Sequence, residues 1–327
     1  MSRSPWTLLH AHFHQILKDR NLLPLGQRIL IAVSGGQDSL CLAKLLLDLQ
    51  SRWFWELAIA HCDHRWRSDS AANADFVHTL AQSWQLPYYQ QTATVELTSE
   101  AAARTWRYES LAAIAQQQNF NCIVTGHTAS DRAETMLYNL IRGSGMDGLQ
   151  ALTWQRPLTD NIQLIRPLLS VSRTQTAQFC QEMEIPIWKD STNDDRQYAR
   201  NRIRLDLLPY IQENLNPGVE KALSQTAEVM QADVEYLEAE ANALREQVAG
   251  LNTTDGFNRQ LLRKAPLALQ RRVIRQILQQ ALPVAPSFEH IEKLVNLITA
   301  PNRSQTDPFP GGLIACVEGD WIWLRNR

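Results

Sequence analysis

The sequence predicts a doubly wound α/β fold with a mainly parallel sheet, followed by a smaller, mostly helical C-terminal domain. In the first part of the 327-residue chain, short apolar runs alternate with longer amphipathic runs. This alternation is typical of parallel strands joined by crossover helices, which bind ligands at the carboxyl ends of the strands. After Pro217-Gly218 the strand-like runs give way to helical spacing. We therefore expect two domains, residues 1–216 and residues 217–327.

The elements of the first domain follow from this alternation in chain order. Helical spacing opens the chain over residues 6–23. The runs that predict strands are residues 29–33, 57–61, 88–92 and 122–125. The runs that predict helices are residues 39–50, 69–84, 99–118, 130–142 and 174–183. Helices of this length between strands require crossover connections and hence a parallel sheet.

The second domain is predicted to begin with a long helix over residues 219–248, where apolar side chains recur at heptad-like spacing. Seven acidic and two basic side chains lie in this stretch, so we expect its outer face to be solvated and turned away from any phosphate backbone. A turn-rich break at Asn252–Asp255 precedes another helix near residues 261–282, which carries several basic side chains, including Arg271. The final segments are too short to assign.

Composition narrows the possible functions. A content of 44% hydrophobic residues can bury a full core, and a net charge of −2 means that a nucleic-acid partner must be met by locally clustered arginines. The five cysteines are scattered without Cys-x-x-Cys spacing, which argues against a disulfide framework, a zinc knuckle or a redox pair. We expect a cytoplasmic protein with no membrane role, because no segment resembles a signal peptide or a membrane span. Nothing in the sequence indicates an obligate protein partner.

The loop Ser34-Gly35-Gly36-Gln37-Asp38-Ser39 lies between the first predicted strand and its helix. Two glycines allow backbone N–H groups to turn onto a phosphate at the positive end of the helix, and the two serine hydroxyls add donors. An acidic group such as Asp38 fits beside phosphates where Mg²⁺ lies between them. No Gly-Lys-Ser/Thr closes the loop, so it is not a Walker loop. The alternative is an ordinary βα turn with a helix cap at Ser39.

Two further blocks are expected near this loop. The second strand ends in the polar segment His61–Arg67, which is either a wall of the nucleotide site or a solvated strand end. Helical spacing then places Arg104, Arg107 and Tyr108 on one side of the helix over residues 99–118. The alternative for this helix is a surface face with an ion pair between Glu100 and Arg104.

The segment Gly126–Thr135 follows the strand over residues 122–125. His127, Asp131 and Glu134 recur at intervals of four and three residues, so they can share one face at the start of a helix. Two carboxylates in a cleft could hold an ammonium group, or one of them a metal ion. The alternative is N-terminal capping by Ser130, with both acids favouring the helix dipole.

Two later segments have open interpretations. The glycine-rich segment Arg142–Leu149 could close over a substrate or merely join two elements. Farther on, Lys189–Asn193 leads into an arginine-rich stretch that would suit an RNA backbone, although a charged linker is the alternative. The arginines of this stretch are Arg196, Arg200, Arg202 and Arg204.

In chain order these blocks, together with Arg166-Pro167-Leu168-Leu169, resemble the tRNA(Ile)-lysidine synthetase family of PP-loop ATP pyrophosphatases. The resemblance covers about residues 25–215. The phosphate loop identifies only the broad pyrophosphatase group, whereas Gly126–Thr135 and Arg200–Arg204 narrow it to this family. The chain departs from the family pattern at Trp66, Arg132 and Lys189.

The resemblance implies ATP-dependent joining of free L-lysine to the wobble cytidine of a tRNA(Ile) with a CAU anticodon. ATP would first adenylate the carbon-2 oxygen of the base with release of pyrophosphate, and the lysine ε-amine would then displace AMP. Asp38 would bind Mg²⁺ and act in catalysis with Arg104, Arg107 and His127. Asp131 and Glu134 would bind lysine.

The resemblance also implies binding positions for ATP and tRNA. ATP would contact Ser34, Gly35, Gly36, Gln37, Asp38, Ser39 and His61. The tRNA would contact Arg200, Arg202, Arg204 and Arg271. Two other functions remain open from the residues alone: a tRNA thiolase of the same superfamily, and a non-catalytic adenine-nucleotide sensor.

Overall fold

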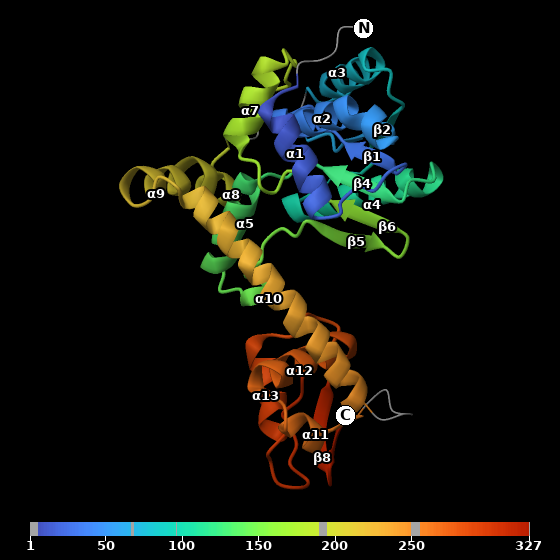
Figure 1. Ribbon diagram of the computed structural model, residues 1–327. Coiled ribbons are helices and arrows are strands. Elements are labelled where there is room, and N and C mark those ends of the chain that lie inside the picture. Colours follow the sequence, from blue (N-terminus) through green and yellow to red (C-terminus); the bar gives the residue numbers. More distant parts are fainter. Residues whose placement is uncertain (1–5, 67–68, 96, 190–194, 250–255, 327) are drawn as a thin grey trace. The chain divides into compact units, whose positions relative to one another are not determined.

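The computed structural model describes residues 6–66, 69–95, 97–189, 195–249 and 256–326 (Figure 1). Arg67, most of Lys189–Asn193 and the expected turn at Asn252–Asp255 therefore lie outside the described residues. The chain forms two compact units, residues 1–230 and 231–327. The predicted boundary at residues 216 and 217 precedes helix α10 (Val219–Val248), and the two units divide within this helix.

A six-stranded sheet forms the centre of the first unit, with strand order β3-β2-β1-β4-β6-β5. The first five strands in this order pair in parallel, and β5 pairs antiparallel with β6. The strands are β1 (Arg28–Ala32), β2 (Glu56–Asp63), β3 (Tyr88–Thr92), β4 (Cys122–Thr125), β5 (Gln155–Thr159) and β6 (Ile162–Ile165). The mainly parallel sheet and the four predicted strands are confirmed, and the hairpin β5–β6 adds two strands that the sequence analysis missed.

Helices cover both faces of this sheet, as its core shows. Ile29 and Ile31 of β1 pack in one apolar cluster with residues of α1, α2 and α7, whereas Leu30 packs in another cluster with residues of α4. Such alternation is expected of a strand buried on both faces. The helices are α1 (Leu8–Asp19), α2 (Gln37–Trp53), α3 (Ser70–Ser83), α4 (Glu100–Gln117), α5 (Ala129–Ile141), α6 (Met146–Leu149), α7 (Arg173–Glu182), α8 (Ala199–Arg202) and α9 (Leu208–Asn214). A π-helical turn, Ile203–Leu207, joins α8 to α9.

The second unit combines helices with a small antiparallel sheet. Its strands β7 (Gly256–Asn258), β9 (Trp321–Asn326) and β8 (Leu313–Glu318) lie in that order, beside α11 (Arg259–Arg263), α12 (Leu267–Ala281) and α13 (Phe288–Leu297). The single helix predicted near residues 261–282 is two helices, because Pro266 lacks a backbone N–H and caps the start of α12. The helical character of the unit is confirmed, and its sheet is an addition. Within the described residues, no helix is long and apolar enough to cross a bilayer.

Candidate active site

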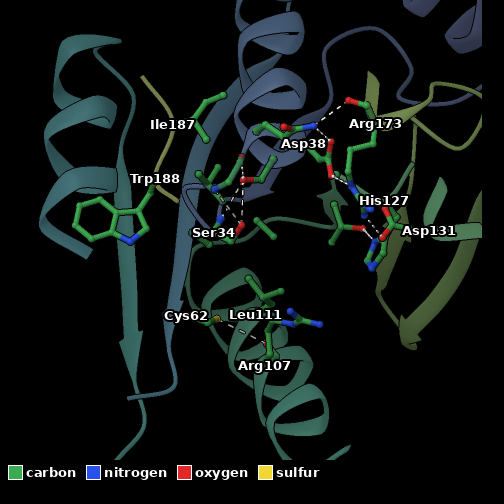
Figure 2. Close-up of a pocket in the computed structure, with 18 of the residues that line it drawn as sticks. Ser34, Asp38, Cys62, Arg107, Leu111, His127, Asp131, Arg173, Ile187 and Trp188 are labelled. Atoms are coloured by element: carbon green, nitrogen blue, oxygen red, sulfur yellow. Dashed lines mark hydrogen bonds and ion pairs between the residues drawn. The ribbon is translucent and has the colours of Figure 1, made fainter. Parts of the chain in front are cut away.

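A cavity of about 630 Å³ lies at the carboxyl ends of β1, β2 and β4 (Figure 2). Its wall also includes the first residues of α2, α5 and α7, one side of α4, residues 187–189 and the α8 region. The predicted site residues that line it are Ser34, Gly36, Gln37, Asp38, Ser39, Arg107, His127, Asp131, Arg200 and Arg204. The phosphate loop and one of the two predicted amine-binding acids therefore share a single cavity.

The phosphate loop follows directly from the end of β1, and α2 begins at Gln37. The Ser39 hydroxyl accepts from the Ser34 backbone N–H (3.2 Å) and donates to the Gly36 carbonyl (2.9 Å), which closes the loop on itself. Gly35 has a φ of +88°, and a Cβ there would lie 2.7 Å from the Asn73 side chain. Glycine is thus required at this position by both backbone conformation and space.

Gly126 brings the end of β4 against the same loop. A Cβ at this position would lie 2.7 Å from the carbonyl oxygen of Asp38 and 2.8 Å from the backbone nitrogen of Ser39. These are fixed backbone atoms, so even a methyl group would separate the loop from the start of α5. The glycine in Gly126-His127 therefore sets the distance between the phosphate loop and the acids of α5.

Asp38 faces the cavity from the first turn of α2. Its carboxylate accepts from the hydroxyl of Thr176 and lies 3.3 Å from Nε of Arg173, both on α7. Burial raises the pKa of Asp38 above its ordinary value, and the Asp131 charge adds to this rise while Arg173 opposes it. The proton on Asp38 is consequently held more tightly than on an ordinary aspartate.

Asp131 and Glu134 enter the site from the first turns of α5. Asp131 forms a capping box with Thr128, whose backbone N–H and hydroxyl each donate to its carboxylate at 2.8 Å. Asp131 therefore takes part in capping the helix, but the residue at the helix start is Thr128 and not the predicted Ser130, and Glu134 lies beyond the first turn. Capping uses one carboxylate oxygen of Asp131 and leaves the other, Oδ1, facing the cluster described next.

Three arginines surround these two acids. Asp131 Oδ1 lies 3.0 Å from Arg173 and 2.8 Å from Arg200, and the Glu134 carboxylate pairs with Arg173, Arg200 and Arg204 at 2.8 to 3.1 Å. Burial would raise the pKa of each acid, but for Asp131 the charges of Arg173 and Arg200 outweigh it and hold the pKa below the ordinary range. For Glu134 the hydrogen bond from Arg204 and the charges of Arg173 and Arg200 do the same. Both acids are therefore carboxylates at neutral pH.

The arginine-rich stretch is divided by its position on α8 and the π-helical turn. Arg200 and Arg204 point into the cavity and pair with the acids, whereas the Arg202 side chain is exposed. Contact of Arg200 and Arg204 with RNA remains a prediction, and in the structure their partners are carboxylates. Arg173 and Thr176 were not among the predicted site residues. The available signal was Ser172, an N-cap that places Arg173 at the first position of α7, shortly after the motif Arg166–Leu169.

His127 lines the cavity from the turn between β4 and α5. Its Nδ1 atom lies 2.8 Å from the hydroxyl of Thr125. Burial lowers the pKa of His127 well below its ordinary value, and the charges of Arg166, Arg107 and Arg200 lower it further. The imidazole is therefore neutral near pH 7 and is unsuited to donate a proton as a general acid.

The predicted pair on α4 is arranged around Tyr108. The guanidinium carbons of Arg104 and Arg107 lie 5.3 Å and 5.6 Å from the centre of the Tyr108 ring, and only Arg107 lines the cavity. Burial raises the pKa of the buried Tyr108 hydroxyl, but the charges of Arg104, Arg166 and Arg107 bring it below the ordinary value. The cation–π contacts hold both guanidinium groups against one ring.

Two further predicted residues, His61 and Gln37, contact the phosphate loop or the helix packed against it. His61 does not line the cavity, and its Nδ1 lies 2.8 Å from the carbonyl oxygen of Val33, at the start of the phosphate loop. The Gln37 side chain turns toward α7, where its amide donates to the carbonyl of Arg173 at 2.9 Å. In the structure these two side chains position the loop.

Two of the three residues that depart from the family pattern, Trp66 and Arg132, form hydrogen bonds within the structure. Arg132 is fully buried and points away from Asp131, donating to Glu228 of α10 at 2.5 Å. Trp66 donates from its indole nitrogen to the carbonyl of Leu97 at 2.8 Å. Lys189 lines the cavity and is exposed to solvent. None of the three removes a group from the acid cluster.

Two further regions that were predicted to act in binding do not line the cavity. Residues 146–149 of the glycine-rich segment form the short helix α6, tied to α5 by a 2.7 Å hydrogen bond from Asn139 to the carbonyl of Gly148, and the segment does not line the cavity. Arg271 lies on α12 of the second unit, where it forms a two-point ion pair with Glu292 at 2.7 and 3.0 Å. Its role in binding tRNA remains a prediction.

Comparison with known proteins finds matches along most of the chain. A PP-loop domain matches residues 7–211, and a TilS substrate binding domain matches residues 257–323. A tRNA(Ile)-lysidine synthase from a Nostoc species is 63% identical over 334 residues, covering 98% of each chain. One from a Synechocystis species is 52% identical and covers 97% of each chain. The U34-tRNA thiolase NcsA from Methanococcus maripaludis, described with its [4Fe-4S] cluster, shares the fold with a TM-score of 0.57 at 16% identity, over 68% of this chain and 78% of that one.

Proposed function

Because the chain belongs to the tRNA(Ile)-lysidine synthase family, we propose that it joins free L-lysine to the wobble cytidine of a tRNA(Ile) with a CAU anticodon. The carbon-2 oxygen of the base attacks the α-phosphate of ATP, and pyrophosphate leaves. The lysine ε-amine then attacks carbon 2, and AMP leaves with that oxygen. The observation that carries the proposal is the single cavity lined by both the phosphate loop and Asp131.

The first step places the triphosphate against the loop. The Ser34 hydroxyl and the N-terminus of α2 offer donors to its oxygens, and the Ser39 hydroxyl can do so by leaving the Gly36 carbonyl. Asp38 would hold Mg²⁺ there, which would neutralise charge on the leaving pyrophosphate. The Asp38 carboxylate at the phosphate loop fits this ion, because Mg²⁺ commonly binds one or two carboxylates together with substrate phosphates and water.

The second step places the amine against the acids of α5. Asp131 and Glu134 are charged at neutral pH and can hold the ε-ammonium group of lysine before it loses a proton. Arg107 faces the same cavity and would stabilise negative charge on the activated base and on AMP. A neutral His127, held by the Thr125 hydroxyl, can orient the cytosine, whereas its lowered pKa makes the imidazole a weak proton acceptor.

Among the described residues, the cavity contains no thiol that is suited to sulfur transfer. Cys62 is the one cysteine among the described residues that line the cavity, and burial raises the pKa of its thiol to about 12. A thiol with that pKa is protonated at neutral pH and is a weak nucleophile.

The test is incubation of the protein with ATP, radiolabelled lysine and an unmodified tRNA(Ile) transcript. We expect label in the RNA that depends on ATP and on the transcript. A transcript with uridine at the wobble position is the matched control and should remain unlabelled. No transfer of label to the RNA with all substrates present would contradict the proposed function.

A further inference from the structure

The acids that are proposed to bind the amine already have a cationic partner in the structure. One guanidinium group, that of Arg173, contacts all three carboxylates of the site. Figure 2 labels Arg173 together with two of them, Asp38 and Asp131. Its Nε lies 3.3 Å from Asp38, and its two terminal nitrogens lie 3.0 Å from Asp131 and 2.9 Å from Glu134. An ammonium group bound by the acid pair would compete with Arg173 for the same oxygen atoms.

Arg173 differs from the two other arginines of the cluster in what it can reach. Arg200 and Arg204 pair with acids of α5. Arg173 also pairs with Asp38, which belongs to the phosphate loop, so it spans both halves of the cavity. About a quarter of its side chain is exposed (27%), and Arg173 lines the cavity beside the phosphate loop.

The backbone of Arg173 is held by hydrogen bonds that do not involve its side chain. Its N–H donates to the hydroxyl of Ser130 at 3.1 Å, and its carbonyl accepts from Gln37 at 2.9 Å and from Thr176 at 2.9 Å. The side chain can therefore change partners by rotation, without any movement of α7. This is the arrangement expected of a residue that exchanges one anionic partner for another.

Charge balance indicates when the exchange takes place. Three carboxylates face three guanidinium groups, so the cluster is formally neutral. An added ammonium group would leave excess positive charge in a buried site, and this is unfavourable unless an anion enters as well. The triphosphate of ATP supplies such an anion beside the phosphate loop.

We propose that Arg173 is a positioning residue that couples lysine binding to ATP binding: it holds Asp131 and Glu134 until a triphosphate is bound, then turns to the phosphates and releases the acids for the amine. The inference rests on the proposed function. It predicts that ATP strengthens lysine binding, and by thermodynamic reciprocity that lysine strengthens ATP binding by the same factor.

The substitution Arg173→Gln tests the coupling without stripping the acids of partners. Glu134 keeps Arg200 and Arg204, Asp131 keeps Arg200 and Thr128, and Asp38 keeps Thr176. The matched control is Arg28→Gln, which removes an exposed arginine paired with Glu56 at the start of β1. Circular dichroism checks that each variant is folded.

The measurement is calorimetric binding of lysine, with and without Mg²⁺ and α,β-methylene ATP, which cannot be cleaved at the α,β position. For the wild-type protein and Arg28→Gln we expect the analogue to strengthen lysine binding at least tenfold. For Arg173→Gln we expect lysine to bind without the analogue and the ratio to fall close to one. A wild-type ratio of one, or an unchanged ratio in Arg173→Gln, would overturn the proposal.

The two hypotheses fail in different ways. Wild-type protein that labels tRNA(Ile) with lysine but binds lysine equally well with and without the analogue contradicts the role of Arg173 alone. Wild-type protein that transfers no lysine with all substrates present contradicts the proposed function itself.

Discussion

At the scale of single residues, the site depends on glycines that bring backbones together. Gly126→Ala would place a methyl group 2.7 Å from the Asp38 carbonyl, so the phosphate loop must shift relative to α5. We expect a loss of about 1–3 kcal/mol in the free energy of unfolding and a larger proportional loss in kcat/KM for ATP. Gly145→Ala is the matched control, because nothing lies within 4 Å of its added Cβ. Equal activity in the two variants would contradict this role.

The opposite pKa directions of the acids predict a pH dependence. Burial raises the pKa of Asp38, whereas arginines lower the pKa of Asp131 and Glu134. As the pH falls, Asp38 therefore gains a proton while the other two acids are still charged. We expect kcat/KM for ATP, measured by pyrophosphate release, to decline on the acid side with an apparent pKa above that of an ordinary aspartate.

The same profile distinguishes Asp38 from His127. The pKa of His127 lies well below the ordinary value, so His127→Asn should lower the rate without moving the acid limb. An acid limb at or below the ordinary aspartate pKa would contradict the environment described for Asp38.

Some residues of the site could be predicted from the sequence, and others could not. Asp38, Asp131 and His127 were predicted because their spacing after strands places them at one edge of the sheet, and they line the same cavity. Arg173 was missed because it follows an ordinary helix cap, and nothing in local spacing shows that its side chain reaches three acids far away in the chain. Contacts of this kind depend on tertiary packing.

At the scale of elements, helix α5 is joined to α10 through buried charge. Arg132 donates to Glu228, which also accepts from the Trp154 indole at 2.7 Å and pairs with Arg20 at 2.7 Å. Glu228→Gln removes the charge from this junction, so we expect a loss of about 1–3 kcal/mol, measured by urea unfolding.

The control for this prediction lies on the same helix. Glu235 is exposed and accepts one hydrogen bond from Gln231, so Glu235→Gln should change stability by about 0.5 kcal/mol or less. If Glu228→Gln is as mild as Glu235→Gln, the junction does not stabilise the unit.

The elements that were predicted are those with strong periodicity. The long helix over residues 219–248 was predicted to the residue, because apolar spacing persists through it. Strands β5 and β6 were missed because they are short and β5 contains Pro157, although Asp160 and Asn161 between them are residue types that favour turns. The two helices on either side of Pro266 were predicted as one helix, although proline is typical of a helix start.

At the scale of the whole molecule, the second unit is proposed to contribute to tRNA binding. Arg271 is partly exposed and would exchange Glu292 for a phosphate of the RNA. We expect Arg271→Gln to weaken tRNA(Ile) binding severalfold and to reduce the dependence of log affinity on log salt by about one, with KM for ATP unchanged. Filter binding over a range of salt concentrations measures both quantities.

A pair of similar geometry provides the comparison for Arg271. Arg325 on β9 pairs with Glu318 at 2.7 and 3.0 Å and is also exposed. If Arg271→Gln leaves affinity and salt dependence unchanged, or if Arg325→Gln has the same effect, the assignment of Arg271 to the tRNA interface is wrong.

If one cavity carries out two steps with separate residues, Asp38→Asn and Asp131→Asn should impair different steps. With ATP, labelled lysine and tRNA(Ile), both pyrophosphate release and label in the RNA are measured for each variant. We predict that Asp38→Asn loses both signals, whereas Asp131→Asn still releases pyrophosphate but transfers little lysine. Equal loss of both signals in the two variants would contradict the division of the cavity into a phosphate half and an amine half.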